Sequence, residues 1–147
     1  KLAQPTLITP HAGELAKLLN SRGVQVSAEA IEGDPRKWVQ VASDTLKVTV
    51  LLKGAITFVA DSEQLIELPK ATPWLATAGT GDVLAGIVAA LVATNEVEIL
   101  NDETTLARVA ASAAFIHNAA ALKAADGGPI TATQILGFIP QTIKKLI

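Results

Sequence analysis

The fold is decided by the stretch ATAGTGDVLAG, residues 76–86. At its centre, Gly79-Thr80-Gly81-Asp82 directly precedes an apolar segment that is expected to be a helix ending near Thr94. The first N–H groups of a helix lack internal partners and carry partial positive charge, and glycines let a phosphate approach them. Asp82 is poorly suited to binding phosphate, because the two repel, but it could take a proton from a hydroxyl that attacks phosphorus. The alternative is a plain helix start in which Asp82 complements the helix dipole.

The segments around this stretch predict an α/β architecture. The continuous apolar run Val48–Leu52 is typical of a strand buried on both faces. Further strands are expected at Thr6–Thr9, Ile56–Ala60 and Gln64–Leu68, and the last of them alternates, which indicates one wet face at a margin of the sheet. Helices are expected at Ala12–Asn20, Asp34–Leu46, Val83–Thr94 and Glu103–Ala125, followed by a short helix that Thr131 or Thr133 caps and a tail beginning at Pro140.

This order of elements predicts a three-layer sandwich with a mostly parallel sheet and helices on both faces. The Val83–Thr94 helix is rich in Ala, Val and Leu, so we expect it to be buried. The 147 residues suffice for one domain. The chain opens on Lys1 without an initiator Met, which favours a piece of a longer protein.

Composition narrows the function. The net charge of −2 argues weakly against a nucleic-acid binder, and no apolar run approaches the roughly 18 residues of a membrane span. The chain has no Cys, which excludes disulfides and Cys-type zinc sites and favours a cytoplasmic location.

Two further motifs are expected at the carboxyl edge of the sheet, where open α/β sheets bind ligands. Thr9-Pro10-His11-Ala12-Gly13-Glu14 follows a strand and opens a helix, and Lys53-Gly54-Ala55-Ile56-Thr57 follows the apolar strand. Each has a structural alternative: His11 could bond only to backbone, Glu14 could complement a helix dipole, and Lys53 could be solvated. His117, in the long Ala-rich helix, is expected to serve packing. Trp74 could shelter a ligand or anchor its loop.

The three motifs together, in this order, resemble the ribokinase-like superfamily and, within it, the ADP- or ATP-dependent NAD(P)H-hydrate dehydratases. These enzymes repair hydrated nicotinamide cofactors. The resemblance covers nearly the whole chain and implies that residues 1–147 are the C-terminal portion of one such domain, with the N-terminal portion absent.

The resemblance also implies roles for the matching residues. Asp82 would be the catalytic base and a substrate contact, and His11 would contact the hydrated nicotinamide. The segment Lys53, Gly54, Ala55, Ile56 and Thr57 would lie along the adenine nucleotide, while Gly79, Thr80 and Gly81 would form its anion hole. Sugar kinases of the superfamily carry Asn where this chain has His11, and they keep a Glu linked to magnesium; Glu14 could therefore organise Mg²⁺ through water.

The implied reaction uses ADP or ATP to phosphorylate the ring hydroxyl of hydrated NAD(P)H, after which phosphate leaves. Relatives assemble as homo-oligomers, tetramers in this family, and we expect the same here. Two rivals remain: a small-molecule kinase of the same superfamily, acting on a vitamin precursor or sugar, and a nucleotide-binding module without turnover.

Overall fold

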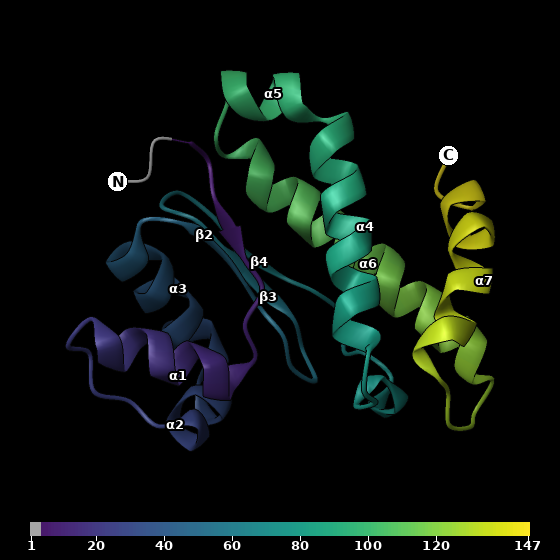
Figure 1. The fold of residues 1–147 in the computed structure, drawn as a ribbon, viewed down its shortest axis with the longest axis horizontal. Helices are drawn as coiled ribbons and strands as arrows, with labels where there is room; N and C mark the ends of the chain where they lie inside the picture. The colour runs from purple at the N-terminus through teal and green to yellow at the C-terminus, as the bar shows by residue number, and fades with distance from the viewer. Residues whose placement is uncertain (1–3) are drawn as a thin grey trace.

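The computed structural model describes residues 4–147. Figure 1 shows a central sheet with helices on either side of it. The strands are β1 (Leu7–Ile8), β2 (Thr49–Leu52), β3 (Phe58–Ala60) and β4 (Leu65–Glu67). The helices are α1 (Ala12–Ser21), α2 (Ala28–Gly33), α3 (Pro35–Leu46), the 3₁₀ turn η1 (Pro73–Leu75), α4 (Thr80–Thr94), α5 (Glu96–Asn101), α6 (Thr105–Ala125) and α7 (Ala132–Lys144).

The four strands form one sheet in the order β1-β2-β3-β4. β1 and β2 are parallel, with Leu7 opposite Thr49 and Ile8 opposite Val50, while β2–β3 and β3–β4 are antiparallel. The prediction of a mostly parallel sheet is therefore wrong for the part of the chain that the structure describes. Only β1 and β2 are separated by the helices that a parallel crossover needs, whereas short turns join β2 to β3 and β3 to β4.

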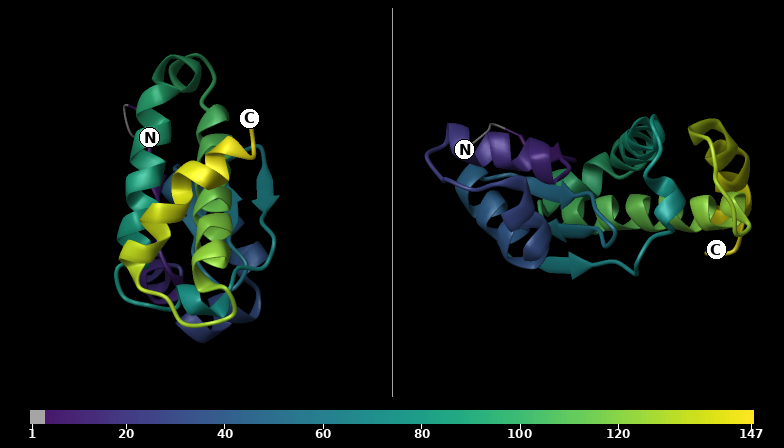
Figure 2. Two further views of the ribbon diagram at one scale, coloured as in Figure 1. Left: turned by 90° about the vertical axis from the view of Figure 1, so that its right-hand side faces the viewer. Right: turned by 90° about the horizontal axis from the view of Figure 1, so that it is seen from below.

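Both faces of the sheet are covered, which confirms the three-layer α/β class. Val50 and Leu52 point into a core with α1, α2 and α3, while Leu51 and Val59 point into a second core with α4 and α6. The alternation explains why β2 is buried along its whole length, as its apolar run predicted. In Figure 2, α7 lies beyond α6, on the side away from the sheet.

Helix α4 is less buried than its sequence predicted. Leu84 and Val88 are buried against α6, but small residues on the other side of the helix are exposed. The exposed residues of this side include Ala85, Gly86, Ala89, Ala90 and Ala93. The prediction of a buried helix is wrong for this face, because within residues 4–147 the helix packs on one side only (Figure 1).

Other boundaries also differ from prediction. Thr131 caps α7 through a capping box with Gln134, as predicted, but the helix continues through Pro140 to Lys144 instead of ending there. Proline removes one hydrogen bond from a helix interior without always ending the helix, and the packing of α7 on α6 maintains it here. The short helices α2 and α5 were not predicted. None of the helices among residues 4–147 has the length and apolar character needed to cross a membrane.

Candidate functional site

The first turn of α1 holds His11 in one orientation. The Nδ1 atom of His11 accepts hydrogen bonds from the backbone N–H groups of Gly13 (3.1 Å) and Glu14 (3.3 Å). In return, the Glu14 carboxylate accepts from the His11 N–H at 2.8 Å, which completes a capping box. Because Nδ1 acts as an acceptor, the proton of a neutral ring lies on Nε2. The exposed His11 ring therefore offers an N–H donor to a ligand.

Lys53 is aligned with His11 at the carboxyl ends of β1 and β2. The two residues form an isolated parallel bridge, and the Lys53 N–H donates to the carbonyl of Pro10 at 2.9 Å. The Lys53 ammonium lies 3.7 Å from the Glu14 carboxylate. The pKa of Glu14 is lowered chiefly by the hydrogen bond from the His11 backbone; partial burial opposes this shift, and the charges of Lys53 and His11 add to it.

The segment after Lys53 is fixed by a facing loop. The carbonyl of Ala55 accepts from the Ala71 N–H at 2.9 Å, and that of Thr57 accepts from the Leu68 N–H at 3.0 Å. Ile56 packs against the core of α1, α2 and α3. These contacts leave the segment little freedom and give a ligand a preformed wall.

A left-handed turn leads into α4. Gly79 has a φ of 85°, which favours glycine. The hydroxyl of Thr80 is turned inward, 2.8 Å from the carbonyl of Leu75 and 2.9 Å from that of Thr77, and it stabilises the loop. The hydroxyl of Thr80 therefore bonds to the protein's own backbone. The Gly81 N–H, by contrast, has no hydrogen-bond acceptor within residues 4–147.

These elements surround a pocket of about 600 Å³, called the α4 pocket below. Seven of the predicted site residues line it: His11, Lys53, Gly54, Ala55, Thr57, Thr80 and Gly81. The predicted residues Glu14, Ile56, Gly79 and Asp82 are not in its wall. Asp82 follows Gly81 in the first turn of α4 and is exposed. The structure therefore brings six of the eight predicted nucleotide-binding residues together in one wall, without Ile56 and Gly79, and Asp82 lies next to this wall.

His117 is a pocket residue that the sequence prediction assigned to packing. It is 5% exposed, lies in α6 and lines the α4 pocket together with Asn118. Its Nε2 is the one buried side-chain N or O atom among residues 4–147 without a hydrogen-bond partner. Burial lowers the pKa of His117, while contacts with the Asn118 side chain and the Thr80 backbone oppose that shift. The sequence did contain one sign that His117 lines a pocket: it is a polar residue in an apolar, Ala-rich helix.

The residues do not fit a magnesium site centred on Glu14. Its carboxylate is already engaged by the His11 backbone and faces the Lys53 ammonium. Within residues 4–147, no group of three or more His, Asp or Glu side chains is arranged to hold a metal ion. Mg²⁺ usually keeps several of its waters, so the predicted contact of Glu14 with the ion through water stays a prediction.

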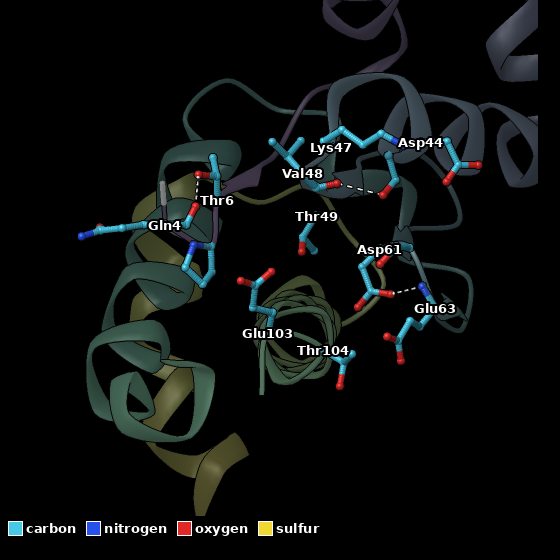
Figure 3. A pocket seen from close by; sticks show the side chains of 13 residues that line it. Gln4, Thr6, Asp44, Lys47, Val48, Thr49, Asp61, Glu63, Glu103 and Thr104 are labelled. Carbon is cyan, nitrogen blue, oxygen red and sulfur yellow. Dashed lines mark hydrogen bonds between the residues drawn. The ribbon is translucent and has the colours of Figure 1, made fainter. Parts of the chain in front are cut away.

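A second pocket, of about 590 Å³, lies at the opposite edge of the sheet, near the amino ends of β1 and β2. Figure 3 shows the carboxylates of Asp61 and Glu103 facing the space next to Thr49. Asp61 accepts hydrogen bonds from Glu63 and Gln64, so it stabilises the turn between β3 and β4. This pocket is acidic and would repel a nucleotide phosphate, whereas the α4 pocket contains Lys53.

Comparisons with known proteins identify the family of the chain. The family model described as NAD(P)H-hydrate dehydratase matches residues 1–141. The chain belongs to this family. It is 38% identical over 146 residues to a bifunctional NAD(P)H-hydrate repair enzyme of Mycobacterium leprae, covering 97% of this chain and 26% of that protein. It is 32% identical over 140 residues to an ADP-dependent (S)-NAD(P)H-hydrate dehydratase of Cenarchaeum symbiosum, covering 94% of this chain and 44% of that one.

Solved structures of similar fold confirm the ribokinase-like class. An ADP/ATP-dependent NAD(P)H-hydrate dehydratase from Bacillus subtilis, co-crystallised with ATP/Mg²⁺, matches with a TM-score of 0.79 at 22% identity, covering all of this chain and 50% of that one. A ribokinase-like superfamily protein from Enterococcus faecalis matches with a TM-score of 0.75 at 25% identity, covering 99% of this chain and 46% of that one. The chain thus spans about half the length of these structures, or less.

Proposed function

We propose that the protein containing this chain restores hydrated NAD(P)H to NAD(P)H in a reaction driven by ADP or ATP. The observation that carries the proposal is the unpaired Gly81 N–H at the wall of the α4 pocket, with the Lys53 ammonium close by. A Cβ added to Gly81 would lie 3.6 Å from the Nζ of Lys53. A helix N-terminus and a lysine together favour an anionic phosphoryl group.

The nucleotide is proposed to occupy the α4 pocket. Its volume of about 600 Å³ is within the range of small-molecule sites, and its wall combines Gly54, Ala55 and Thr57 with Lys53. The terminal phosphoryl group would meet the N–H of Gly81, which has no side chain to block the approach. Thr80 would contribute backbone, since its hydroxyl is bonded to the loop, and Ile56 would support the segment by packing against the core.

The substrate is proposed to lie on the Asp82 side of the same helix end. Asp82 would take the proton of the ring hydroxyl as that oxygen attacks the terminal phosphorus, and the bond to the leaving nucleotide phosphate would break. The new phosphate ester would then leave with help from the ring nitrogen lone pair, and loss of a proton from the neighbouring ring carbon would restore the dihydronicotinamide. His11, as an Nε2–H donor, would hold an acceptor oxygen of the substrate.

The site would also need further parts of the protein and a metal ion. The relatives are longer than this chain, and an N-terminal portion of the same domain, outside residues 1–147, would complete the substrate side next to Asp82 and cover the exposed face of α4. Any Mg²⁺ would arrive with the nucleotide phosphates, as is common for this ion, rather than be held by Glu14. The homo-oligomer and the cytoplasmic location predicted from the sequence belong to the same proposal.

Replacing Asp82 with Asn tests the proposal in the full-length protein. The change keeps size but removes the base, so the rate of NADH-hydrate repair should fall by about 10²–10⁴-fold. ADP affinity should hold or rise, because one negative charge near the phosphates is gone. Asp44→Asn, an exposed acid of α3, is the matched control and should keep full activity. Activity of Asp82→Asn within about tenfold of the parent would remove Asp82 from its role.

The same assay separates the rival functions. A small-molecule kinase would leave phosphate on an alcohol product and release no inorganic phosphate with hydrated NADH. A binding module would bind ADP without turnover. Release of inorganic phosphate in step with NADH formation supports the dehydratase.

A further inference from the structure

The surroundings of Glu14 point to a role other than metal binding. One carboxylate oxygen accepts the His11 N–H at 2.8 Å and lies 3.7 Å from the Lys53 Nζ. The other lies 3.5 Å from the Nε2 of His11. Every recorded neighbour of this carboxylate is a donor, and each comes from a residue that lines the α4 pocket.

Lys53 needs a partner to be held where it lies. A lysine side chain has four rotatable bonds and loses up to about 2 kcal/mol of rotamer entropy when fixed. Within residues 4–147, Glu14 is the one carboxylate recorded within ion-pair distance of Lys53. In that position the Lys53 ammonium lies next to the first turn of α4, 3.6 Å from where a Cβ of Gly81 would be.

We propose that Glu14 is a positioning residue that holds the Lys53 ammonium at the N-terminus of α4, ready for a phosphoryl oxygen of the nucleotide. This inference rests on the proposed nucleotide site. It links the two motifs at the carboxyl edge of the sheet, because Glu14 at the start of α1 would orient the ammonium group of Lys53, which follows β2.

Two effects of Glu14 on nucleotide binding oppose each other. Its negative charge repels phosphate, and its contact with Lys53 organises an attractive charge. Only the second effect depends on Lys53. A double-mutant cycle therefore isolates it, because replacing Lys53 removes the positioning effect and leaves the repulsion.

The first experiment measures the dissociation constant of ADP for the full-length protein by calorimetry. Glu14→Gln is the informative variant, because Gln can complete a capping box and so keeps the helix start while removing the charge. Glu14→Gln should weaken ADP binding about two- to fivefold, the range of an exposed ion pair, and should leave binding unchanged or tighter in a Lys53→Met background. Glu67→Gln, which breaks the exposed Arg36 pair away from the pocket, is the matched control and should change nothing.

Equal weakening by Glu14→Gln in the parent protein and in the Lys53→Met background, or tighter binding by Glu14→Gln alone, would overturn the inference. So would a rise in the Mg²⁺ concentration needed for ADP binding in both backgrounds, because that result assigns Glu14 to the metal. An unchanged Mg²⁺ requirement supports positioning.

A second measurement needs no nucleotide. Carboxyl NMR titration should show the pKa of Glu14 rising when Lys53 is replaced by Met, since one cause of its lowering is removed. An unchanged titration would show that the pair does not form and would overturn the inference. A parent protein that binds no ADP would instead refute the proposed function, while the titration would still decide whether Glu14 holds Lys53.

Discussion

A Cβ on Gly79 would lie 3.2 Å from the Cβ of Ala132, so the turn into α4 closes directly against the first residue of α7. Gly79 is also the N-cap of α4 and has a positive φ. The N-terminus of α4 faces the pocket. Its position therefore depends on Gly79, which has no side chain, and on the contact with α7.

Replacing Gly79 with Ala should destabilise the protein by about 1–2 kcal/mol, because an L-residue at this φ is strained and its Cβ would press on Ala132. ADP binding should weaken as well, since the first turn of α4 would shift. Chemical denaturation and calorimetry measure the two effects. Gly137→Ala, in the interior of α7, is the control: its Cβ would meet open space, and it should stabilise by about 0.5–1 kcal/mol. Similar effects of the two substitutions would contradict this account.

Replacing Thr80 with Val should remove the hydroxyl that contacts the carbonyls of Leu75 and Thr77. Loss of one such hydrogen bond should cost about 1 kcal/mol of unfolding free energy. Thr80→Ser keeps the hydroxyl and should retain most of the stability. Denaturation curves of the two variants give the comparison. If the hydroxyl instead contacts the nucleotide, Thr80→Val will impair ADP binding without a loss of stability.

Replacing His11 with Asn should separate its two roles. Asn is a good N-cap, so helix α1 and the melting temperature should be retained. The Nε2–H of His11 is lost, so the KM for hydrated NADH should rise while kcat changes less. His11→Ala, which lacks a cap as well, should also lose about 1 kcal/mol of stability. A melting temperature lowered equally by Asn and Ala would argue against the capping geometry.

Replacing His117 with Leu should flatten the dependence of stability on pH. Burial lowers the pKa of His117 below its ordinary 6.5, so the unfolded chain binds more protons than the native one below that value. The parent protein should therefore lose stability as pH falls from about 7 through 6.5 and below, and the variant should lose less. The loss from Glu14, whose pKa is lowered from 4.5, occurs at more acidic pH and stays separate. Parallel stability curves for parent and variant between about pH 7.5 and 5.5 would contradict the burial effect.

Sequence patterns predicted which motifs meet in space better than they predicted the direction of the strands. The motifs around His11, Lys53 and Gly81 each combine a strand end or a helix start with residues suited to anions, and all three reach one pocket. The β2–β3–β4 hairpins were mistaken for parallel strands, because apolar runs do not reveal strand direction. His117 escaped detection because its role depends on which face of α6 meets the pocket, and that is set by tertiary packing.

The pairing of β1 with β2 has a consequence for how the chain folds. The hairpins β2–β3 and β3–β4 join neighbouring segments and can form locally, whereas β1 meets β2 only after α1, α2 and α3 have been placed between them. The bridge between His11 and Lys53 depends on that later closure. A chain that has formed its hairpins but not this pairing would possess strands and helices without a binding site, so ligand binding would report on completion of the fold.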